Sequence, residues 1–317
     1  MINHVPVMME EAIKNLNVDN EGVYIDATLG GGGYSKLLYN LVQKSNFKTI
    51  LISFDLDYEA IENYKEFFKI TNWENVNEKI IFTEIDGMKI ILVNDNFANI
   101  SEVMTELYKK GIVEEKYKVH GIVADLGLNS SQLDSKKGFS FQNLQQDLDM
   151  RLDKNSGVKA SDLLIVGNAK QLSEMFTKYG DLKNSWKLAQ NIKKFITKPT
   201  VTVNDLINII NKTFGKNSAV KNDVHAKVFQ ALRIAVNNEY YNLEQLLLKG
   251  TEVLEQGGRI IIVSFHSGED RIVKHYINKN KDLLVALNEG KIQIPSEDET
   301  EKNPRARSAK LRGFIKL

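Results

Sequence analysis

The chain has 317 residues and a net charge of +1, and 42% of its residues are hydrophobic. This length and composition suit one large α/β domain or two domains, and they argue against disorder. The absence of cysteine excludes disulfide scaffolds, thiolate zinc sites, iron–sulfur enzymes and enzymes that attack a pyrimidine ring through a cysteine. The small net charge gives no global sign of nucleic-acid binding, so such a signal has to be local.

The N-terminal segment MINHVPVMMEEAI has two acids and no basic start, which is unlike a secretory signal peptide. No apolar run approaches the roughly 20 residues of a membrane helix. The five histidines include no helical His-x-x-x-His pair of a metal site. We therefore expect a cytoplasmic protein with no membrane contact and no metal ligand set, which begins with a short amphipathic helix over residues 5–17.

Residues 23–57 predict a strand, a glycine-rich turn, a helix and a second strand. Gly30 to Gly33 form the turn and Asp55 ends the second strand, as in the first half of a nucleotide-binding βαβ unit. Ser35 takes the place of the third glycine of G-x-G-x-x-G, and Asp26 would repel a pyrophosphate, which argues against a nicotinamide cofactor. Asp26 suits a ligand with an ammonium group, such as S-adenosylmethionine, or it caps the turn.

The following segments continue the alternation of helices and strands. We expect a helix over 58–70, strand-like runs over 79–85 and 89–97, a helix over 101–112 and a buried strand that ends at residue 125. A doubly wound unit needs only one of the two strand-like runs, so part of this region is an expected insertion. The βαβα order predicts a doubly wound parallel sheet.

From Asp134 to about Gly215 the pattern changes to helical segments without a strong strand signal. Their ranges are 169–180, 185–196 and 203–215, and Thr202 with Asp205 forms a capping box before the third. Residues 183–227 hold nine lysines and two acids. This excess suggests a phosphate-facing surface on an inserted helical subdomain, although a solvated face is the alternative.

The last part of the chain returns to the sheet pattern. We expect one long helical stretch over 228–254, a fifth buried strand after the Gly257-Gly258 turn, and a helix over 269–279. The C-terminal segment is a second basic patch, which ends in an expected edge strand. Its basic residues, with no acid among them, are Arg305, Arg307, Lys310, Arg312 and Lys316.

Three strand ends are candidates for the functional site, because ligands of open parallel sheets bind beyond the carboxyl ends of the strands. They are Asp26 with the glycines, Asp125 in DLGLNSSQLD and His266 in SFHSGEDR. All three fall on one rim if the sheet has the expected order. His266 could orient a base or accept a proton near neutral pH, or it could be purely structural.

Three further sets of residues admit both a structural and a functional interpretation. These are Phe139 with Phe141, Asp149 with Arg151, and Gln230 with Arg233 and Asn237. The phenylalanines could be core residues or a stacking surface for a flipped base. The acid and the arginine could form an ion pair or contact a substrate. The three polar residues share a helical face, so they need polar partners or face a cleft.

These motifs together resemble the bacterial ribosomal RNA small-subunit cytosine-4-amino methyltransferases, the MraW or RsmH family. The matching strings are HVPVMMEEAI, YIDATLGGGGYS, FDLD, DLGLNSSQLD, GFSF, LDMRLD, FQALRIAVNNE, GGRIIIVSFHSGEDRIVK and NPRARSAKLR, and they run from residue 4 to residue 312. The resemblance implies a class I S-adenosylmethionine-dependent methyltransferase fold, which is Rossmann-like, with an inserted helical subdomain. It also implies methylation of the exocyclic 4-amino group of a cytidine in the decoding region of small-subunit (16S) ribosomal RNA.

Site residues follow from the resemblance by position in the motifs. The implied cofactor contacts are Gly32, Gly33, Tyr34, Asp55, Phe97, Asp125 and Gln132, with Asp55 on the ribose and Phe97 by the adenine. The expected catalytic residues are Asp125 near the methyl donor and Asp149 or His266 near the amine. The expected substrate contacts are Arg151, Arg233, Asn237 and Arg305. The expected partner is ribosomal RNA in an assembled or nearly assembled small subunit, and a homodimer is left open.

The chain departs from the family pattern in several places, which include the lack of the usual proline before LDMR and extra residues near 84–93. Tyr34 stands where histidine is usual, and Gly268 replaces the leucine of FHSLEDR. Residues 223–228 differ from the usual basic run, so the contacts made there are expected to differ as well.

The expected domain organisation is a methyltransferase domain over 1–136 and 223–317, with a substrate-recognition subdomain over 137–222. Two other functions fit parts of the pattern. One is a nicotinamide-dependent oxidoreductase on a Rossmann-like fold. The other is a non-catalytic RNA-binding assembly factor, with which the lysine-rich insert is equally consistent.

Overall fold

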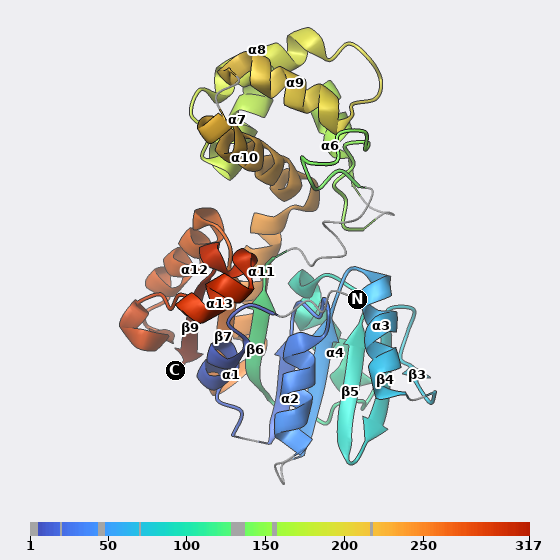
Figure 1. Cartoon of the computed structure of the whole chain (residues 1–317). Helices are drawn as coiled ribbons and strands as arrows, with labels where there is room; N and C mark the ends of the chain where they lie inside the picture. Colours follow the sequence, from blue (N-terminus) through green and yellow to red (C-terminus); the bar gives the residue numbers. More distant parts are fainter. Residues whose placement is uncertain are drawn as a thin grey trace. The chain divides into compact units, whose positions relative to one another are not determined.

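The computed structural model describes residues 6–19, 21–43, 48–69, 71–127, 137–153, 157–215 and 218–317, with the backbone alone for 218–222. The chain divides into two compact units, one formed by Met1–Gly127 with Tyr240–Leu317 and one by Leu128–Glu239. Figure 1 shows a sheet with helices in the first unit and only helices in the second. None of the helices in the described part of the chain is long and apolar enough to span a bilayer.

Within the described residues, the sheet of the first unit has nine strands in the order β3-β4-β5-β2-β1-β6-β7-β9-β8. Its parallel centre consists of β5 Met88–Val93, β2 Thr49–Phe54, β1 Gly22–Asp26, β6 Val119–Asp125 and β7 Leu254–Ser264. Antiparallel strands flank it, β4 Ile80–Ile85 and β3 Glu74–Asn75 on one side and β9 Lys310–Lys316 and β8 Leu284–Ala286 on the other. The strand order reverses its direction at β1, and such a switch point is where ligands bind.

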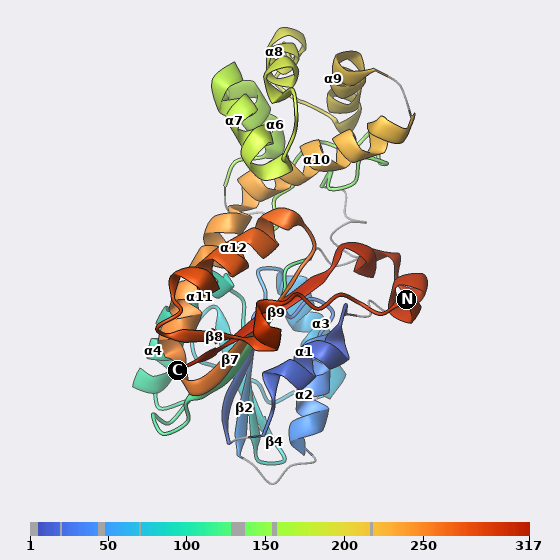
Figure 2. The same cartoon turned by 90° about the vertical axis from the view of Figure 1, so that its left-hand side faces the viewer.

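Helices cover both faces of the sheet. On one face lie α1 Met9–Leu16, α2 Gly33–Gln43 and α3 Tyr58–Phe68. On the other lie α4 Ile100–Lys109, α11 Glu239–Val253 and α12 Ser267–Lys279. Short helices complete the unit, namely η1 Phe97–Asn99, η2 Leu287–Gly290, α13 Glu297–Lys302 and η3 Pro304–Ser308. Figure 2 shows the strands between these two layers of helices, with α4 and α11 on one side and α1 and α2 on the other.

The apolar runs of the parallel strands supply both cores of this unit. In β2, Ile50, Ile52 and Phe54 face α4 and α11, while Leu51 faces the layer of α1 to α3. Because successive side chains of a strand point to opposite faces, a strand that is covered on both sides is apolar throughout. The doubly wound parallel sheet predicted from the sequence is confirmed.

The second unit is a bundle around its own apolar core. The helices in its described residues are α6 Ala160–Val166, α7 Ala169–Gly180, α8 Ser185–Phe195, α9 Val203–Phe214 and α10 Ser218–Asn237. The predicted capping box begins α9, where the Thr202 hydroxyl accepts a hydrogen bond from Asp205 N–H at 3.3 Å. The core includes Phe176, Leu188 and Leu206, all fully buried.

Several features of the chain differ from the sequence expectation. The helix expected over 228–254 is broken at Asn238, whose φ is +51°, a conformation that asparagine tolerates better than most residues. The units therefore divide at 239/240 and not at 222/223, which lies within α10. At the other junction they divide at 127/128, whereas the expectation was 136/137.

The expected C-terminal edge strand is not at the edge, because β9 pairs with β7 on one side and with β8 on the other. The strand-like run over 79–85 is β4, which forms an antiparallel hairpin with β5. Asp86 and Gly87 turn the hairpin with φ of +51° and +80°, as a two-residue turn requires. The extra strand therefore widens the sheet without disturbing its parallel centre.

The packing of α1 on β6 generates a prediction about Gly121. A Cβ atom at Gly121 would lie 2.8 Å from Leu16 Cδ1 and from a ring carbon of Tyr24. We expect Gly121→Ala to destabilise the protein by about 1–3 kcal/mol because it overpacks this contact. Leu16→Ala should cost about 2–5 kcal/mol through a cavity. The double variant should lose less stability than the sum, which urea denaturation measures. Strict additivity would contradict the contact.

Candidate active site

The carboxyl group of Asp26 closes the turn that follows β1. Asp26 is fully buried, and it accepts hydrogen bonds from Thr28 N–H at 3.1 Å and from the Ser35 hydroxyl at 2.7 Å. The Ser35 and Ser53 hydroxyls are 2.7 Å apart, which ties the start of α2 to β2. Both oxygens of Asp26 therefore organise the turn, which is the capping alternative that the sequence left open.

Close contacts explain why glycines follow Asp26. Gly32 has a φ of +75°, and a Cβ atom there would lie 2.4 Å from the ring of Tyr64. A Cβ atom at Gly33 would lie 2.0 Å from Pro6 Cγ. Side chains at these positions would displace the turn, so the glycines allow its backbone to pack closely at the end of β1.

Asp55 and Asp125 lie on either side of β1 at the carboxyl edge of the sheet. The carboxylate of Asp55 accepts hydrogen bonds from Gly30 N–H at 2.7 Å and Asp57 N–H at 2.8 Å. The N–H of Asp125 donates to Thr28 Oγ1 at 2.7 Å. The buried Oδ1 of Asp125 has no hydrogen-bond partner among the described residues. The glycine turn and both acids thus share one edge, as the sequence predicted.

Burial disfavours the ionised form of the three acids at this edge of the sheet. It raises the pKa of Asp26 and of Asp55 to about 6 and the pKa of Asp125 to about 7. The negative charge of Asp26 also contributes to raising the pKa of the other two. A bound cation would stabilise the ionised carboxylates, and Oδ1 of Asp125 offers an acceptor that no described residue occupies. The residues therefore fit S-adenosylmethionine, which carries a sulfonium, an ammonium group and ribose hydroxyls.

Two other implied cofactor contacts are Phe97 and Gln132. Phe97 begins η1 just after β5, and its partly buried side chain packs against the core of α4 and α11. It follows the strand next to β2, so it belongs to the same edge as Asp55. Gln132 lies outside the described residues.

Departures from the family pattern have local explanations in the structure. Tyr34 is buried and its hydroxyl donates to the carbonyl of Val7, so this hydroxyl is engaged within the fold. At Gly268 a Cβ atom would lie 1.7 Å from the Tyr240 hydroxyl, which fills the space of the missing side chain. In the segment 223–228, His225 is buried and its Nε2 lies 3.2 Å from Asn211 Oδ1.

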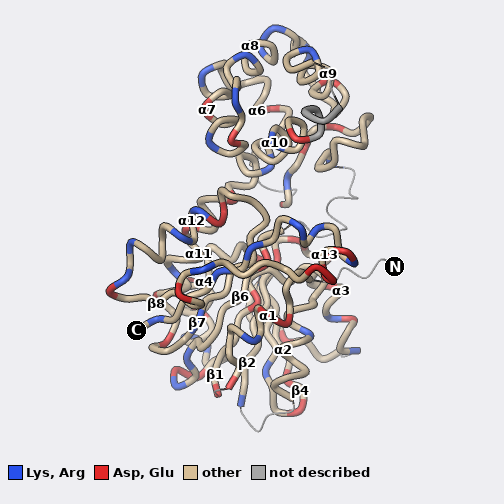
Figure 3. The backbone as a smooth tube through the Cα atoms, turned by 60° about the vertical axis from the view of Figure 1, so that its left-hand side comes forward, with Lys and Arg blue, Asp and Glu red and all other residues tan. Residues whose placement is uncertain are grey.

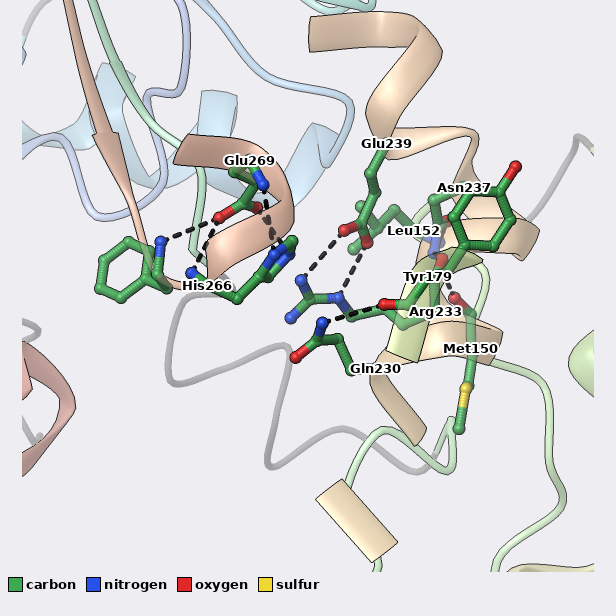
Figure 4. Close-up of polar contacts among 10 residues, drawn as sticks. Met150, Leu152, Tyr179, Gln230, Arg233, Asn237, Glu239, His266 and Glu269 are labelled. Carbon is green, nitrogen blue, oxygen red and sulfur yellow. Dashed lines mark hydrogen bonds and ion pairs between the residues drawn. The ribbon is translucent and has the colours of Figure 1, made fainter. Parts of the chain in front are cut away.

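His266 caps α12, as Figure 4 shows. Its Nδ1 accepts a hydrogen bond from Glu269 N–H at 3.3 Å, and the Glu269 carboxylate accepts from Phe265 N–H at 2.8 Å and His266 N–H at 3.3 Å. Its Nε2 is 3.2 Å from Glu269 Oε1, but the two are not aligned for a hydrogen bond. This reciprocal capping box gives His266 a structural task, and a catalytic task stays a prediction.

In the second unit, two expected functional arginines are in two-point ion pairs. Arg151 donates to Asp149 at 2.7 and 3.0 Å, and Arg233 donates to Glu239 at 2.9 and 3.0 Å. Burial acts to raise the pKa of Asp149, but the hydrogen bonds and charge of Arg151 hold it below its usual value. Both arginines therefore form ion pairs within the protein, as the structural interpretation predicted. Their contact with a substrate stays a prediction.

Asn237 joins α10 to the loop at 150–152, as Figure 4 shows. Its amide donates to the carbonyls of Met150 and Arg233, each at 2.9 Å, and its oxygen accepts from Leu152 N–H at 2.9 Å. Gln230 on the same helix donates to the carbonyl of Tyr179 at 3.1 Å. The polar partners expected for this face of α10 are thus found inside the protein.

The remaining expected site residues are two phenylalanines and an arginine. Phe139 is a core residue with 7% of its surface exposed. Phe141 is partly buried and contacts the ring of Phe229 at 5.9 Å between centroids. Arg305 lies exposed in η3.

Sequence reasoning missed the residues that support the site. Thr28, Ser35 and Ser53 hold the acids and the turn, and Glu269 completes the cap of His266. The spacing of Glu269 three residues after His266 is a capping signal that could have been read. The contact between Ser35 and Ser53 joins a helix to a strand 18 residues on, and no local pattern predicts it.

Asp125 gives the ligand-free protein a measurable pH dependence. Its folded pKa of about 7 exceeds the ordinary value of 3.8, so the folded state binds more protons between these values and loses stability as pH rises. We expect Asp125→Asn to gain stability relative to the wild type from pH 5 to pH 8, since one pKa unit equals about 1.4 kcal/mol. Thermal denaturation at four pH values measures this. The control at an exposed residue is Asp298→Asn. If the difference in stability between Asp125→Asn and the wild type does not change with pH, the raised pKa of Asp125 is contradicted.

Comparison with known proteins covers the whole chain. A family model described as the MraW methylase family matches residues 1–317. A protein from Clostridioides difficile named ribosomal RNA small subunit methyltransferase H is 36% identical, with 99% of each chain covered. A protein of the same name from Thermosipho melanesiensis is 36% identical over 98% of this chain and 96% of its own. Among solved structures, an rRNA methylase from Streptococcus thermophilus matches 98% of this chain and 93% of its own at 12% identity, with a TM-score of 0.41.

These findings confirm the resemblance stated from the motifs, and with it the α/β methyltransferase fold class and the enzyme class. They support neither the nicotinamide-dependent oxidoreductase nor the non-catalytic assembly factor. The chain belongs to the MraW methylase family.

Proposed function

We propose that the protein transfers a methyl group from S-adenosylmethionine to the exocyclic 4-amino group of a cytidine in the decoding region of small-subunit ribosomal RNA. The observation that carries the proposal is the buried Oδ1 of Asp125, which has no hydrogen-bond partner in the described part of the chain and lies at the same sheet edge as the two other acids. Family membership supports the reaction class, and the printed names of the relatives support ribosomal RNA of the small subunit as substrate.

S-adenosylmethionine is the methyl donor of this family, and it supplies an activated methyl group on a positively charged sulfur. The backbone of Gly32 and Gly33 would form the floor of its site, and Asp55 would accept hydrogen bonds from the ribose. Phe97, Tyr34 and Gln132 are the further proposed contacts. Since the Tyr34 hydroxyl is already engaged, its contribution would come from the backbone or the ring.

Asp125 would act on the cytosine amine. This amine is a poor nucleophile because its lone pair is delocalised into the ring, so it has to be held in line and deprotonated. Oδ1 of Asp125 can accept one N–H of the amine and take the proton that the amine loses. A pKa of about 7 suits such a proton acceptor near neutral pH. Asp149 is the weaker candidate, because its lowered pKa makes it a poorer base.

The unit formed by residues 128–239 is proposed as the substrate-recognition part, with Arg151, Arg233 and Asn237 as its proposed contacts and Arg305 as the contact from the first unit. We propose an assembled or nearly assembled small subunit as the substrate, since the decoding region acquires its shape there, and hence a cytoplasmic location. A homodimer is an alternative to a monomer that sedimentation of the purified protein tests.

Methyl incorporation tests the proposed function directly. Labelled S-adenosylmethionine is incubated with the protein and with either small subunits or naked ribosomal RNA from cells that lack this activity, and the nucleosides are analysed by mass spectrometry. We expect N4-methylated cytidine from the subunits at a higher rate than from naked RNA. A labelled product other than this nucleoside, or no label in any RNA, would refute the proposal.

The two acids should separate binding from chemistry. Asp125→Ala should lower kcat/KM by at least about 100-fold at saturating cofactor, the usual contribution of a positioned proton acceptor. Asp55→Asn should instead raise the Kd for S-adenosylmethionine by about 10-fold, measured by calorimetry. The matched control is Asp57→Asn, which keeps an N-cap side chain for α3. Wild-type turnover of Asp125→Ala would discard its assignment.

His266 can be tested with a substitution that keeps its structural task. His266→Ala should cost about 1 kcal/mol of stability through the lost cap, whereas His266→Asn should restore the cap. If His266 also orients the amine, His266→Asn will be stable and yet slow in methyl transfer. Equal activity of His266→Asn and the wild type would assign His266 to capping alone.

A further inference from the structure

Some of the lysines in residues 183–227 are paired with groups of the protein itself, and only the others are available to a ligand. Lys198 is paired with Asp205 at 2.8 Å and Lys227 with Asp223 at 2.7 Å, and these are the two acids of the segment. Lys193 donates to the carbonyl of Ile165 and so serves the end of α6. Apart from Lys193, the described lysines of the segment without a carboxylate partner are Lys183, Lys187, Lys194 and Lys212.

Three of these four lysines lie on α8 or next to it. Lys187 and Lys194 are seven residues apart, so they lie on one side of this helix, and Lys183 precedes it. The helix sequence SWKLAQNIKKF contains no acid. Figure 3 shows Lys and Arg segments along α7 and α8 of this unit. Most of the described lysines of this segment that lack a carboxylate partner therefore lie on or beside one helix.

An exposed indole lies among these charges. Trp186 has 51% of its surface exposed, while Leu188 and Ala189 on the other side of α8 are fully buried. Trp186, Gln190 and Lys194 follow one another at intervals of four residues, so they are neighbours on the solvent side. Trp186 and Phe195 are the exposed aromatic residues of the described part of this unit, and both belong to α8.

Phe195 holds a cation at the end of the same helix. The ammonium of Lys212, from α9, lies 3.8 Å from the centre of its ring, and that of Lys194 lies 5.7 Å from it. Such cation–π contacts fix the position of a charge without neutralising it. The two ammonium groups are thus held at the surface without a carboxylate.

We propose that this surface, the α8 patch, binds a single-stranded segment of RNA by stacking one base on Trp186. The patch consists of Lys183, Trp186, Lys187, Lys194, Phe195 and Lys212. An exposed aromatic ring among uncompensated lysines is the arrangement that binds single strands, because stacking needs unpaired bases and the lysines contact phosphates. The proposal rests on the proposed function in that ribosomal RNA supplies the strand. The side of α8 that carries Trp186 lacks the apolar stripe that a protein partner's helix would require.

Tryptophan fluorescence tests the stacking, because the chain has two tryptophans, Trp73 and Trp186. In Trp73→Phe the signal comes from Trp186 alone. We expect an unlabelled single-stranded RNA oligonucleotide of about ten nucleotides to quench the fluorescence of Trp186. A duplex of equal charge should quench it much less. Trp186→Ala should weaken single-strand binding by roughly 5- to 150-fold, the equivalent of about 1–3 kcal/mol. Trp186 is exposed, so circular dichroism should show an intact fold.

A pair of matched double variants tests the charges. Lys187→Gln with Lys194→Gln removes two uncompensated charges, and Lys198→Gln with Lys227→Gln removes two that are ion-paired. The first should lower the slope of log affinity against log salt by about 1.4, since each phosphate contact on a single strand contributes about 0.7. The second should leave the slope nearly unchanged.

The outcomes separate this inference from the proposed function. An unquenched Trp186 signal, together with unchanged RNA affinity of Trp186→Ala, would overturn the α8 patch even if the wild type methylates small subunits. Quenching by an acidic peptide and not by RNA would also overturn it, in favour of a protein partner. Intact RNA binding by the patch in a protein that transfers no methyl group to any RNA would instead refute the proposed function.

Discussion

The structure depends on one buried carboxyl group, that of Asp26 at the end of the central strand. A charge in that position needs hydrogen-bond donors, and the nearest ones are the N–H of Thr28 and the hydroxyl of Ser35. Their hydrogen bonds bend the chain back on itself directly after β1, so α2 can begin at Gly33. The close approach of this turn to its surroundings then requires glycine at 32 and 33.

The same carboxyl group sets the electrostatics of the sheet edge. It contributes to the raised pKa of Asp55 and of Asp125, which burial raises first. Three acids at one edge destabilise the ligand-free protein when they ionise, and nothing in the packing of the sheet requires this. A cationic ligand removes the penalty, so the arrangement is understandable as a binding site and not as a device of stability.

In the second unit, some basic residues are paired with acids and others are not. Arg151 and Arg233 are paired with acids of the same unit, which makes them parts of the fold before they are anything else. The uncompensated lysines instead gather on α8 around an exposed tryptophan. Residue type therefore does not decide which basic residues are available to a nucleic acid, since this depends on whether the fold holds an acid such as Asp149 or Glu239 within reach of the basic side chain.

The sequence by itself determined the doubly wound sheet, the glycine turn, the strand-end acids Asp26, Asp55 and Asp125, and the family. These are local signals, since a strand buried on both faces is apolar throughout and an acid that ends it is visible in the string. The tertiary structure decided the break at Asn238, the place of β9 inside the sheet, and the structural tasks of His266, Arg233 and Asn237. Apart from the capping signal of Glu269 after His266, local patterns do not contain these outcomes, because a polar side chain takes its role from the partners that folding brings to it. The partners of Asn237 at Met150 and Leu152, for example, are distant in the chain.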